Sequence, residues 1–311
     1  MRVLFWGSPG FAVEPLRALH GSAHNVVGVV CQPDRAAGRG RALRPPLVKT
    51  VAESLGLTVI QPELPRGEDF LARIKSLDPD ISMVVAYGHI LRPEMLSLPR
   101  HGSINLHASL LPAYRGAAPI QRAVLAGETT TGITVIQMDE GMDTGDILAR
   151  EEVMIGSLEP AGELADRLSR LGAGVLLEVL GRITDGSLRP EAQSEQGVSY
   201  APKVKREQAR LDWRDKADNI ACAIRAFDPA PGAFCFYRGK MLKLFCPALG
   251  DRVEKEAAPG RITGVSGQGL AVCCGDGCIV SVREFQAQGK KRMPAEEFLR
   301  GSRLVLGDVL E

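Results

Sequence analysis

The first half of the chain alternates between short apolar runs and segments with apolar residues at helical spacing. Uninterrupted apolar runs are typical of strands that are buried on both faces of a parallel sheet. We expect such strands over residues 3–6, 25–31, 57–61, 80–87, 103–107, 132–138 and 147–155. The helical pattern covers a segment that ends at Leu19 and residues 49–55, 68–77, 118–126 and 161–184. Strands that alternate with helices predict an α/β fold with a mostly parallel, Rossmann-like sheet.

The pattern changes after residue 184. Residues 185–203 are polar, with Gly, Ser, Pro and Gln, which predicts a linker. Short strand candidates follow over residues 233–238, 241–246, 260–265, 269–274 and 278–285. Strands at this close spacing favour a small β-barrel of the OB type. We therefore expect two domains, residues 1–184 and 204–311, joined by a linker over residues 185–203.

Composition narrows the class of protein. The chain is 45% hydrophobic and 24% charged with a net charge of +1, which is ordinary for a soluble protein. Residues 200–311 hold 19 Lys and Arg against 14 Asp and Glu, a weak indication of an anionic partner. The seven cysteines, without a secretory signal or a run of the roughly 20 apolar residues of a membrane helix, predict a reduced, cytoplasmic protein.

Three cysteines near the C-terminus, Cys273, Cys274 and Cys278, resemble a metal site at first sight. They lack a second pair and a nearby His, so the spacing of a zinc site is not met. Two strands joined by a Gly-Asp-Gly turn explain the pattern better. We expect no metal.

Polar side chains occur where three predicted strands end. Asn105 and His107 lie two positions apart, so they project from the same face of a strand. An acidic, glycine-containing loop with Asp143 follows a later strand, and Tyr87, Gly88 and His89 follow an earlier one. Because ligands of parallel α/β sheets bind at the carboxyl ends of the strands, we expect Asn105, His107 and Asp143 to meet there.

An amide, an imidazole and a carboxylate suit the attack of an amine on an acyl carbon. The amide donates to the oxyanion, and the imidazole donates or carries a proton. The carboxylate orients the imidazole. The alternatives are a hydrogen-bonded core histidine and an acidic loop that is only a turn. The turn Gly7-Ser8-Pro9-Gly10 lacks the glycine spacing of a dinucleotide site.

A basic segment follows the second predicted strand. It carries Arg35, Arg39, Arg41, Arg44 and Lys49 against a single Asp, and three Pro and two Gly argue against regular structure. Arginines on such a loop can bind phosphates or stack on bases. We expect a mobile loop that contacts RNA, the alternative being charge that is only solvated.

These motifs resemble the folate-dependent formyltransferases. The resemblance rests on Asn105-Leu-His107-Ala-Ser-Leu-Leu-Pro112 and on Asp143, which follows 36 residues after His107. It implies 10-formyltetrahydrofolate as the donor and Asn105, His107 and Asp143 as the catalytic residues. It also implies a folate-binding site whose residues are Ser109, Leu110, Leu111, Pro112, Tyr87 and Gly88. His89 stands where an aliphatic residue is expected, which would make the wall of the pterin pocket more polar.

Further segments are similar to those of family members that act on tRNA. They are residues 32–40 in the basic loop, residues 114–122, and residues 224–232 at the entry to the predicted barrel. The resemblance implies transfer of the formyl group to the α-amine of methionine on initiator tRNA, for translation initiation. Residues 1–184 would then catalyse, and residues 204–311 would bind tRNA. Arg35, Arg39, Arg41 and Arg44 would contact the tRNA, Arg39 at the acceptor stem.

Three rival functions remain from the sequence. A family member could formylate a small amine, such as a purine precursor or an amino sugar, but this acceptor needs neither the basic loop nor a basic second domain. A hydrolase or oxidase of formyl-folate is a second rival, although the large dehydrogenase domain of the oxidising members is absent. A module that binds RNA or nucleotides without catalysis is the third. We expect a monomer.

Overall fold

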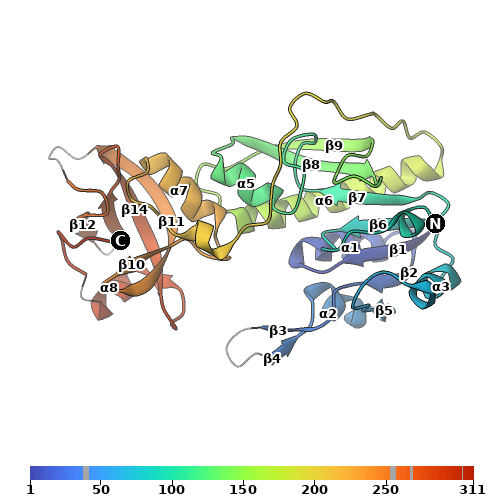
Figure 1. Cartoon of the computed structure of the whole chain (residues 1–311), viewed down its shortest axis with the longest axis horizontal. Coiled ribbons are helices and arrows are strands. Elements are labelled where there is room, and N and C mark those ends of the chain that lie inside the picture. Colours follow the sequence, from blue (N-terminus) through green and yellow to red (C-terminus); the bar gives the residue numbers. More distant parts are fainter. Residues whose placement is uncertain (38–41, 253–256, 267–268, 303) are drawn as a thin grey trace. The chain divides into compact units, whose positions relative to one another are not determined.

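The apolar runs of the first half form a seven-stranded sheet in the computed structural model, which describes residues 1–37, 42–252, 257–266, 269–302 and 304–311. The strands lie in the order β5-β2-β1-β6-β7-β8-β9 (Figure 1). Their bounds are β1 (Arg2–Gly7), β2 (Asn25–Val30), β5 (Val59–Ile60), β6 (Ile81–Val85), β7 (Ser103–His107), β8 (Thr130–Gln137) and β9 (Ile147–Met154). Strands β5, β2, β1, β6 and β7 pair in parallel, which confirms the mostly parallel sheet.

Strand β8 departs from the expected direction. It runs antiparallel to β7, with Ile104 opposite Gln137 and His107 opposite Thr134. The loop after β8 therefore begins at the amino end of β7, and our prediction that three carboxyl ends converge is wrong for this strand. The physical reason is that a strand buried on both faces is an apolar run in either direction, so its direction cannot be predicted from the pattern.

Helices cover the two faces of this sheet. Ile74 of α3 (Glu68–Ser76) and Met95 of α4 (Pro93–Leu96) pack on Leu4, Trp6 and Val84 at one face. On the other face, Gly172 of α6 (Ala161–Thr184) lies directly against Leu106 of β7. The other helical elements that precede α6 in the described chain are η1 (Gly10–Ala12), α1 (Val13–His20), α2 (Leu47–Ser54) and α5 (Pro119–Leu125).

The basic segment contains regular structure, contrary to our prediction. Strands β3 (Arg35–Ala37) and β4 (Ala42–Arg44) pair as an antiparallel ribbon, with Arg35 opposite Arg44 (Figure 1). The prolines do not prevent this pairing because they lie outside the two strands. Residues 38–41, and with them Arg39 and Arg41, lie outside the described residues.

Contacts divide the chain into two compact units. The first comprises residues 1–119, 131–153 and 165–201, and the second comprises residues 120–130, 154–164 and 202–311. The segment that we predicted as a linker lies mostly in the first unit, where Glu191 bridges to Ile147 and Tyr200 bridges to Arg115. The bounds and roles that we assigned to the domains stay predictions.

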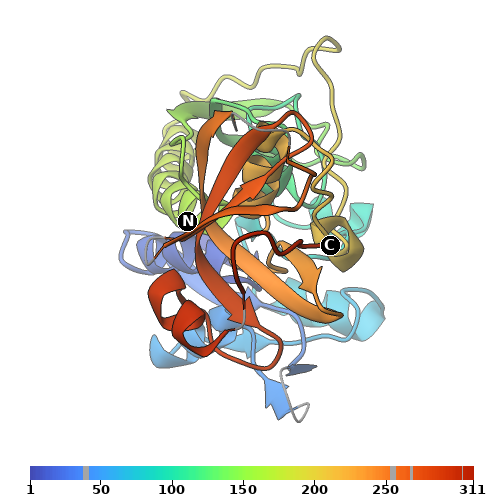
Figure 2. The same ribbon diagram turned by 90° about the vertical axis from the view of Figure 1, so that its left-hand side faces the viewer.

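The second unit is built on an antiparallel sheet, whose strands are drawn in orange and red in Figure 2. Its strands lie in the order β10-β11-β14-β13-β12, with β15 beside β14. The strands are β10 (Phe234–Tyr237), β11 (Lys240–Arg252), β12 (Ile262–Ser266), β13 (Gly269–Cys273), β14 (Cys278–Ala287) and β15 (Met293–Pro294). The sequence analysis did not predict η2 (Arg206–Ala209), α7 (Ala217–Ala226) and α8 (Ala295–Gly301).

The C-terminal segment joins the two edges of this sheet. Glu311 exchanges two backbone hydrogen bonds with Phe236 of β10, and Asp308 accepts one from Ile262 of β12. The sheet therefore closes on itself as a barrel around an apolar core that includes Phe227, Leu244 and Phe285. As predicted, a turn joins the cysteine-bearing strands, with the N–H of Cys274 donating to the carbonyl of Cys278 at 2.9 Å.

No helix in the described part of the chain is long and apolar enough to span a bilayer. Within the same residues, His, Cys, Asp and Glu side chains form no group of three or more that could hold a metal ion.

Candidate active site

Asn105 and His107 lie on the same face of β7, near its carboxyl end. Leu106 between them packs on Gly172 of α6, so Asn105 and His107 project from the opposite face. His107 is 5% exposed and Asn105 is half-buried. Among the described residues we find no hydrogen-bond partner for the Asn105 amide. A half-buried amide without a partner can donate to a ligand.

Both nitrogens of the His107 ring face acceptors. Nε2 lies 2.9 Å from the carbonyl oxygen of Tyr114, and Nδ1 lies 3.6 Å from Oδ2 of Asp143. A carbonyl only accepts, so Nε2 carries a proton and donates to it. Nδ1 is then free to take a second proton, and the Asp143 carboxylate would stabilise the resulting positive charge.

Asp143 reaches His107 because its loop folds back along the sheet. Oδ2 of Asp143 accepts a hydrogen bond from the N–H of Gly116 at 2.8 Å. Gln193 donates from Nε2 to the carbonyls of Asp143 and Gly145, at 2.8 Å each. A Cβ at Gly145 would lie 1.7 Å from the carbonyl oxygen of Gln137, so only glycine fits where the loop returns to the sheet. The predicted set of Asn105, His107 and Asp143 thus gathers in one place.

Left-handed backbone is concentrated in the loops around this set. Tyr114 has φ +61°, Asp143 has φ +56° and Ala86 has φ +49°. Non-glycine residues rarely adopt this region, least of all bulky ones such as Tyr. Such strain persists where the surrounding structure holds the residue, and it is frequent at functional sites. Here it aims the Tyr114 carbonyl and the Asp143 carboxylate at one imidazole.

Comparison with known proteins identifies the family. A family model described as formyl transferase matches residues 1–180, and one described as the formyl transferase C-terminal domain matches residues 203–303. The chain belongs to the formyl transferase family. A protein of Geobacter metallireducens named methionyl-tRNA formyltransferase is 44% identical over 307 residues, which are 99% of this chain and 97% of that protein. The chain is therefore an enzyme of the methionyl-tRNA formyltransferase branch of this family.

Solved structures support the fold. Methionyl-tRNA formyltransferase from Clostridium thermocellum has a TM-score of 0.55 and 17% identity, with 82% of this chain and 95% of that chain covered. HypX from Aquifex aeolicus in complex with tetrahydrofolic acid has a TM-score of 0.65 and 18% identity, with all of this chain and half of that chain covered. At these identities the likeness concerns the fold alone, and it confirms the Rossmann-like class.

The segment predicted for folate binding in this formyl transferase forms a tight turn after β7. Ser109 is fully buried, and its hydroxyl donates to the carbonyl of Ala113 at 2.6 Å. The hydroxyl of Thr134 donates to the carbonyl of Ser109 at 2.7 Å and accepts from the N–H of Leu111 at 3.1 Å. Leu111 is 1% exposed, and Leu110 and Pro112 are half-buried. Ser109 and Leu111 thus stabilise the turn, whereas the partly exposed side chains of Leu110 and Pro112 are available for contact with a ligand.

Tyr87 and Gly88 differ in what they can offer a ligand. Tyr87 is 2% exposed, its ring packs edge-on against Trp6 at 5.2 Å, and burial raises the pKa of its hydroxyl. Its carbonyl accepts a hydrogen bond from Gln32 Nε2 at 3.2 Å. Gly88 is exposed with φ +87°, and with His89 it lines a cavity of about 390 Å³. Any contact from Tyr87 to a ligand must therefore come from its main chain.

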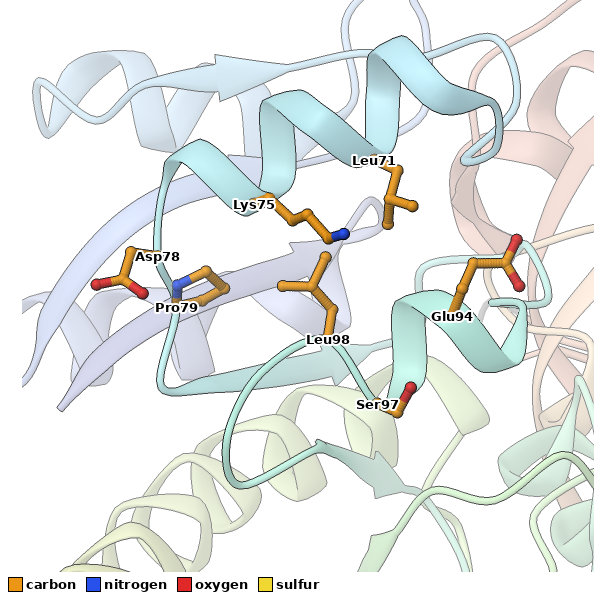
Figure 3. A pocket seen from close by; sticks show the side chains of 7 residues that line it. All are labelled: Leu71, Lys75, Asp78, Pro79, Glu94, Ser97 and Leu98. Atoms are coloured by element: carbon orange, nitrogen blue, oxygen red, sulfur yellow. The ribbon is translucent and has the colours of Figure 1, made fainter.

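A second cavity of about 380 Å³ lies away from this edge. It is lined by Leu71, Lys75, Asp78, Pro79, Glu94, Ser97 and Leu98 (Figure 3). Asp78 and Pro79 precede β6, so the cavity lies near the amino end of that strand, whereas His107 ends β7 at the carboxyl edge. The candidate site does not include it.

The described arginines of the basic ribbon are exposed. Arg35 and Arg44 lie opposite each other across β3 and β4, and Arg35 donates to Oε1 of Gln32 at 3.3 Å. Beside the ribbon, Asp34 accepts from Gln61 at 2.8 Å and from Lys49 at 2.9 Å. These bonds, that of Gln61 above all, lower the pKa of the Asp34 carboxyl.

The sequence analysis assigned no role at the site to three of its residues, although it singled out the segment over residues 114–122. The three are Tyr114, whose carbonyl holds the His107 ring, and Arg115 and Gln193, which bond to each other. No periodic signal marks them, because a main-chain carbonyl has no sequence signature and Gln193 lies in a polar segment without regular structure.

Proposed function

We propose that this enzyme transfers the formyl group of 10-formyltetrahydrofolate to the α-amino group of methionine on initiator tRNA. The observation that carries the proposal is the gathering of Asn105, His107 and Asp143, from segments up to 38 residues apart, with His107 Nδ1 3.6 Å from the Asp143 carboxylate. The names of the full-length relatives specify the acceptor, methionyl-tRNA.

The roles of the three residues follow from the side-chain atoms that each can direct at the substrates. The neutral amine attacks the formyl carbon, and the oxygen of the tetrahedral intermediate becomes negative. The Asn105 amide, which has no hydrogen-bond partner in the described part of the chain, donates to this oxygen. His107 Nδ1 takes the proton that the amine loses, because Nε2 is already protonated toward Tyr114. The Nδ1–H group then stabilises the oxyanion and returns the proton to N10 of the folate as the N10–carbon bond breaks.

Asp143 supplies the counter-charge for this proton transfer. Its carboxylate faces Nδ1, and the Gly116 N–H holds it in place at 2.8 Å. The imidazole becomes positive only in the course of the reaction, so this attraction is larger in the transition state than in the ground state.

The residues near the site suit the folate donor. Leu110 and Pro112 offer apolar surface, and Ala86 and Gly88 are exposed with left-handed φ in a turn where Gly88 lines a cavity of about 390 Å³. A pterin ring needs flat apolar walls and main-chain donors and acceptors along its edge. We assign Tyr87 and Gly88 to the donor site through their main chain, and the turn over residues 109–112 through Leu110 and Pro112.

We assign the basic ribbon to the acceptor tRNA. Arg35 and Arg44 are exposed across the ribbon, and Arg39 and Arg41 belong to the same segment. Guanidinium groups bind phosphates through paired hydrogen bonds, so a segment with four arginines suits a nucleic-acid backbone. The net positive charge of residues 200–311 supports a second contact with tRNA. We propose that the enzyme acts as a monomer in the cytoplasm.

One assay tests the proposed function. Purified protein is incubated with 10-formyltetrahydrofolate and, in separate reactions, with initiator methionyl-tRNA, free methionine or small amines such as an amino sugar. We expect formylation of methionyl-tRNA alone. Preferential formylation of a free amine would replace the proposed acceptor, and consumption of the donor without any formylated product would refute the transfer.

A further inference from the structure

We propose that Gln193 is a positioning residue of the active site, and that residues 191–201, here called the strap, set the geometry of the two groups that touch His107. The inference rests on the proposed function. Gln193 is a positioning residue because it bonds to the loop of Asp143 and to Arg115, and not to the catalytic side chains themselves.

Gln193 uses both ends of its amide. Nε2 donates to the carbonyls of Asp143 and Gly145, at 2.8 Å each. Oε1 accepts two hydrogen bonds from the guanidinium of Arg115, from Nη2 at 2.7 Å and from Nε at 3.2 Å. A single side chain thus bonds to the loop over residues 143–145 and to Arg115, which follows Tyr114 directly.

The strap also forms hydrogen bonds with main-chain groups of residues 114–118. The N–H of Tyr114 donates to the hydroxyl of Ser199, and that of Arg115 donates to the carbonyl of Ser199, both at 2.9 Å. Ala201 donates to the carbonyl of Arg115 at 2.7 Å and accepts from Ala118 at 3.0 Å. Residues 114–118 therefore pair with the strap much as one strand pairs with its neighbour.

The strap holds the two strained residues that contact His107. Tyr114 (φ +61°) directs its carbonyl to Nε2 of His107, and Asp143 (φ +56°) directs its carboxylate to Nδ1. Residues in this region relax toward ordinary backbone unless neighbouring groups hold them. The bonds from Ser199 and Gln193 are such constraints, so the strap controls the two contacts that orient the imidazole.

The position requires the chemistry of an amide. It needs donors for two carbonyls and, from the same side chain, an acceptor for a guanidinium. Glutamate has the same size and would keep the bond to Arg115, but it would place an oxygen against the carbonyls of Asp143 and Gly145. Gln193→Glu therefore separates the contact with the Asp143 loop from the contact with Arg115.

The test compares Gln193→Glu with Gln196→Ala in the full chain. Gln196 lies in the same strap, and its exposed side chain forms no hydrogen bond with the other residues that the structure describes, so its replacement reports general effects on the strap. We expect Gln193→Glu to lower kcat about 10- to 100-fold, as a misplacement of about 1 Å does. The KM for each substrate should change less than about threefold and Tm should match that of Gln196→Ala.

A double-mutant cycle distinguishes positioning from a merely structural role. If Gln193 acts through the Asp143 carboxylate, Gln193→Glu should lower kcat less than about threefold further in an Asp143→Asn background. Multiplying effects in the double variant, an unchanged kcat in Gln193→Glu, or a loss of activity that parallels a loss of folded protein would each overturn the inference. A wild-type protein that formylates no methionyl-tRNA would refute the proposed function, and this inference with it.

Discussion

Replacement of Asp143 by Asn removes one charge from the site and little else. The Asn side chain can still accept the hydrogen bond from the Gly116 N–H, which Asp143 accepts at 2.8 Å. Asn also tolerates left-handed backbone, and Asp143 has φ +56°. Asp143→Ala would lose this bond and add a backbone strain of about 1–2 kcal/mol, so its effect would mix two causes.

The magnitude follows from the separation of Asp143 and His107. At 3.6 Å, a carboxylate and a protonated imidazole attract by about 1 kcal/mol in bulk water and by about 5 kcal/mol at an effective dielectric constant of about 20. The side chains of His107 and Asp143 are 5% and 18% exposed, so the true value lies nearer the second figure. A loss of about 3–4 kcal/mol of transition-state stabilisation corresponds to a factor of about 10²–10³ in rate.

Single-turnover formylation of methionyl-tRNA with saturating donor measures this factor. We expect Asp143→Asn to form formyl-methionyl-tRNA about 10²–10³ times more slowly than the wild type, with the affinity for the donor and the Tm of both proteins similar. Glu140→Gln is the matched control, because it removes a charge from an exposed position in the same loop. A rate for Asp143→Asn within about twofold of the wild type would refute the charge argument.

Three further predictions concern the remaining parts of the molecule. Asn105→Ala should lower kcat about 10²–10³-fold with little change in KM, since it removes an oxyanion donor; a change in KM alone would reassign Asn105 to substrate binding. Arg44→Ala should weaken tRNA binding and leave folate binding unchanged. In a salt titration, the slope of log affinity for tRNA against log salt should become less steep by about one unit, whereas the control Arg100→Ala should match the wild type. Burial raises the pKa of Cys235 and of Cys274 to about 12, so iodoacetamide at pH 8 should label these thiols only when the protein is unfolded in urea. Rapid labelling of either thiol in the folded protein, detected by peptide mass mapping, would contradict their burial.

Elements with a strong periodic signal were predicted from the sequence to within a few residues. The helix predicted over residues 161–184 is α6, and all seven strand candidates of the first half became strands of one sheet. The barrel strands also formed where the turn spacing placed them. These elements are predictable because the pattern of burial repeats with the period of the helix or strand. The residues of each element are therefore enough to predict it.

Elements without such a signal were predicted less well. Helices α7 and α8 were missed, and the ribbon of β3 and β4 was predicted to be irregular. A strand of three residues is too short for alternation to be visible, and in this ribbon exposed arginines take positions where apolar residues would have marked a strand.

The sequence alone determined which side chains could do the chemistry. Asn105 and His107 share a face because β7 is a strand and every second residue of a strand points the same way. That statement needs no tertiary contact.

Only the tertiary structure decided how Asp143 reaches the imidazole. Strand β8 runs opposite to the direction that we assumed, and the loop of Asp143 meets His107 because it folds back and because the Gly116 N–H and the Gln193 amide hold it there. These contacts join residues 27 and 50 positions apart in the chain. Strand direction and long-range hydrogen bonds depend on packing between distant segments, for which a local pattern of apolar and polar residues carries no information.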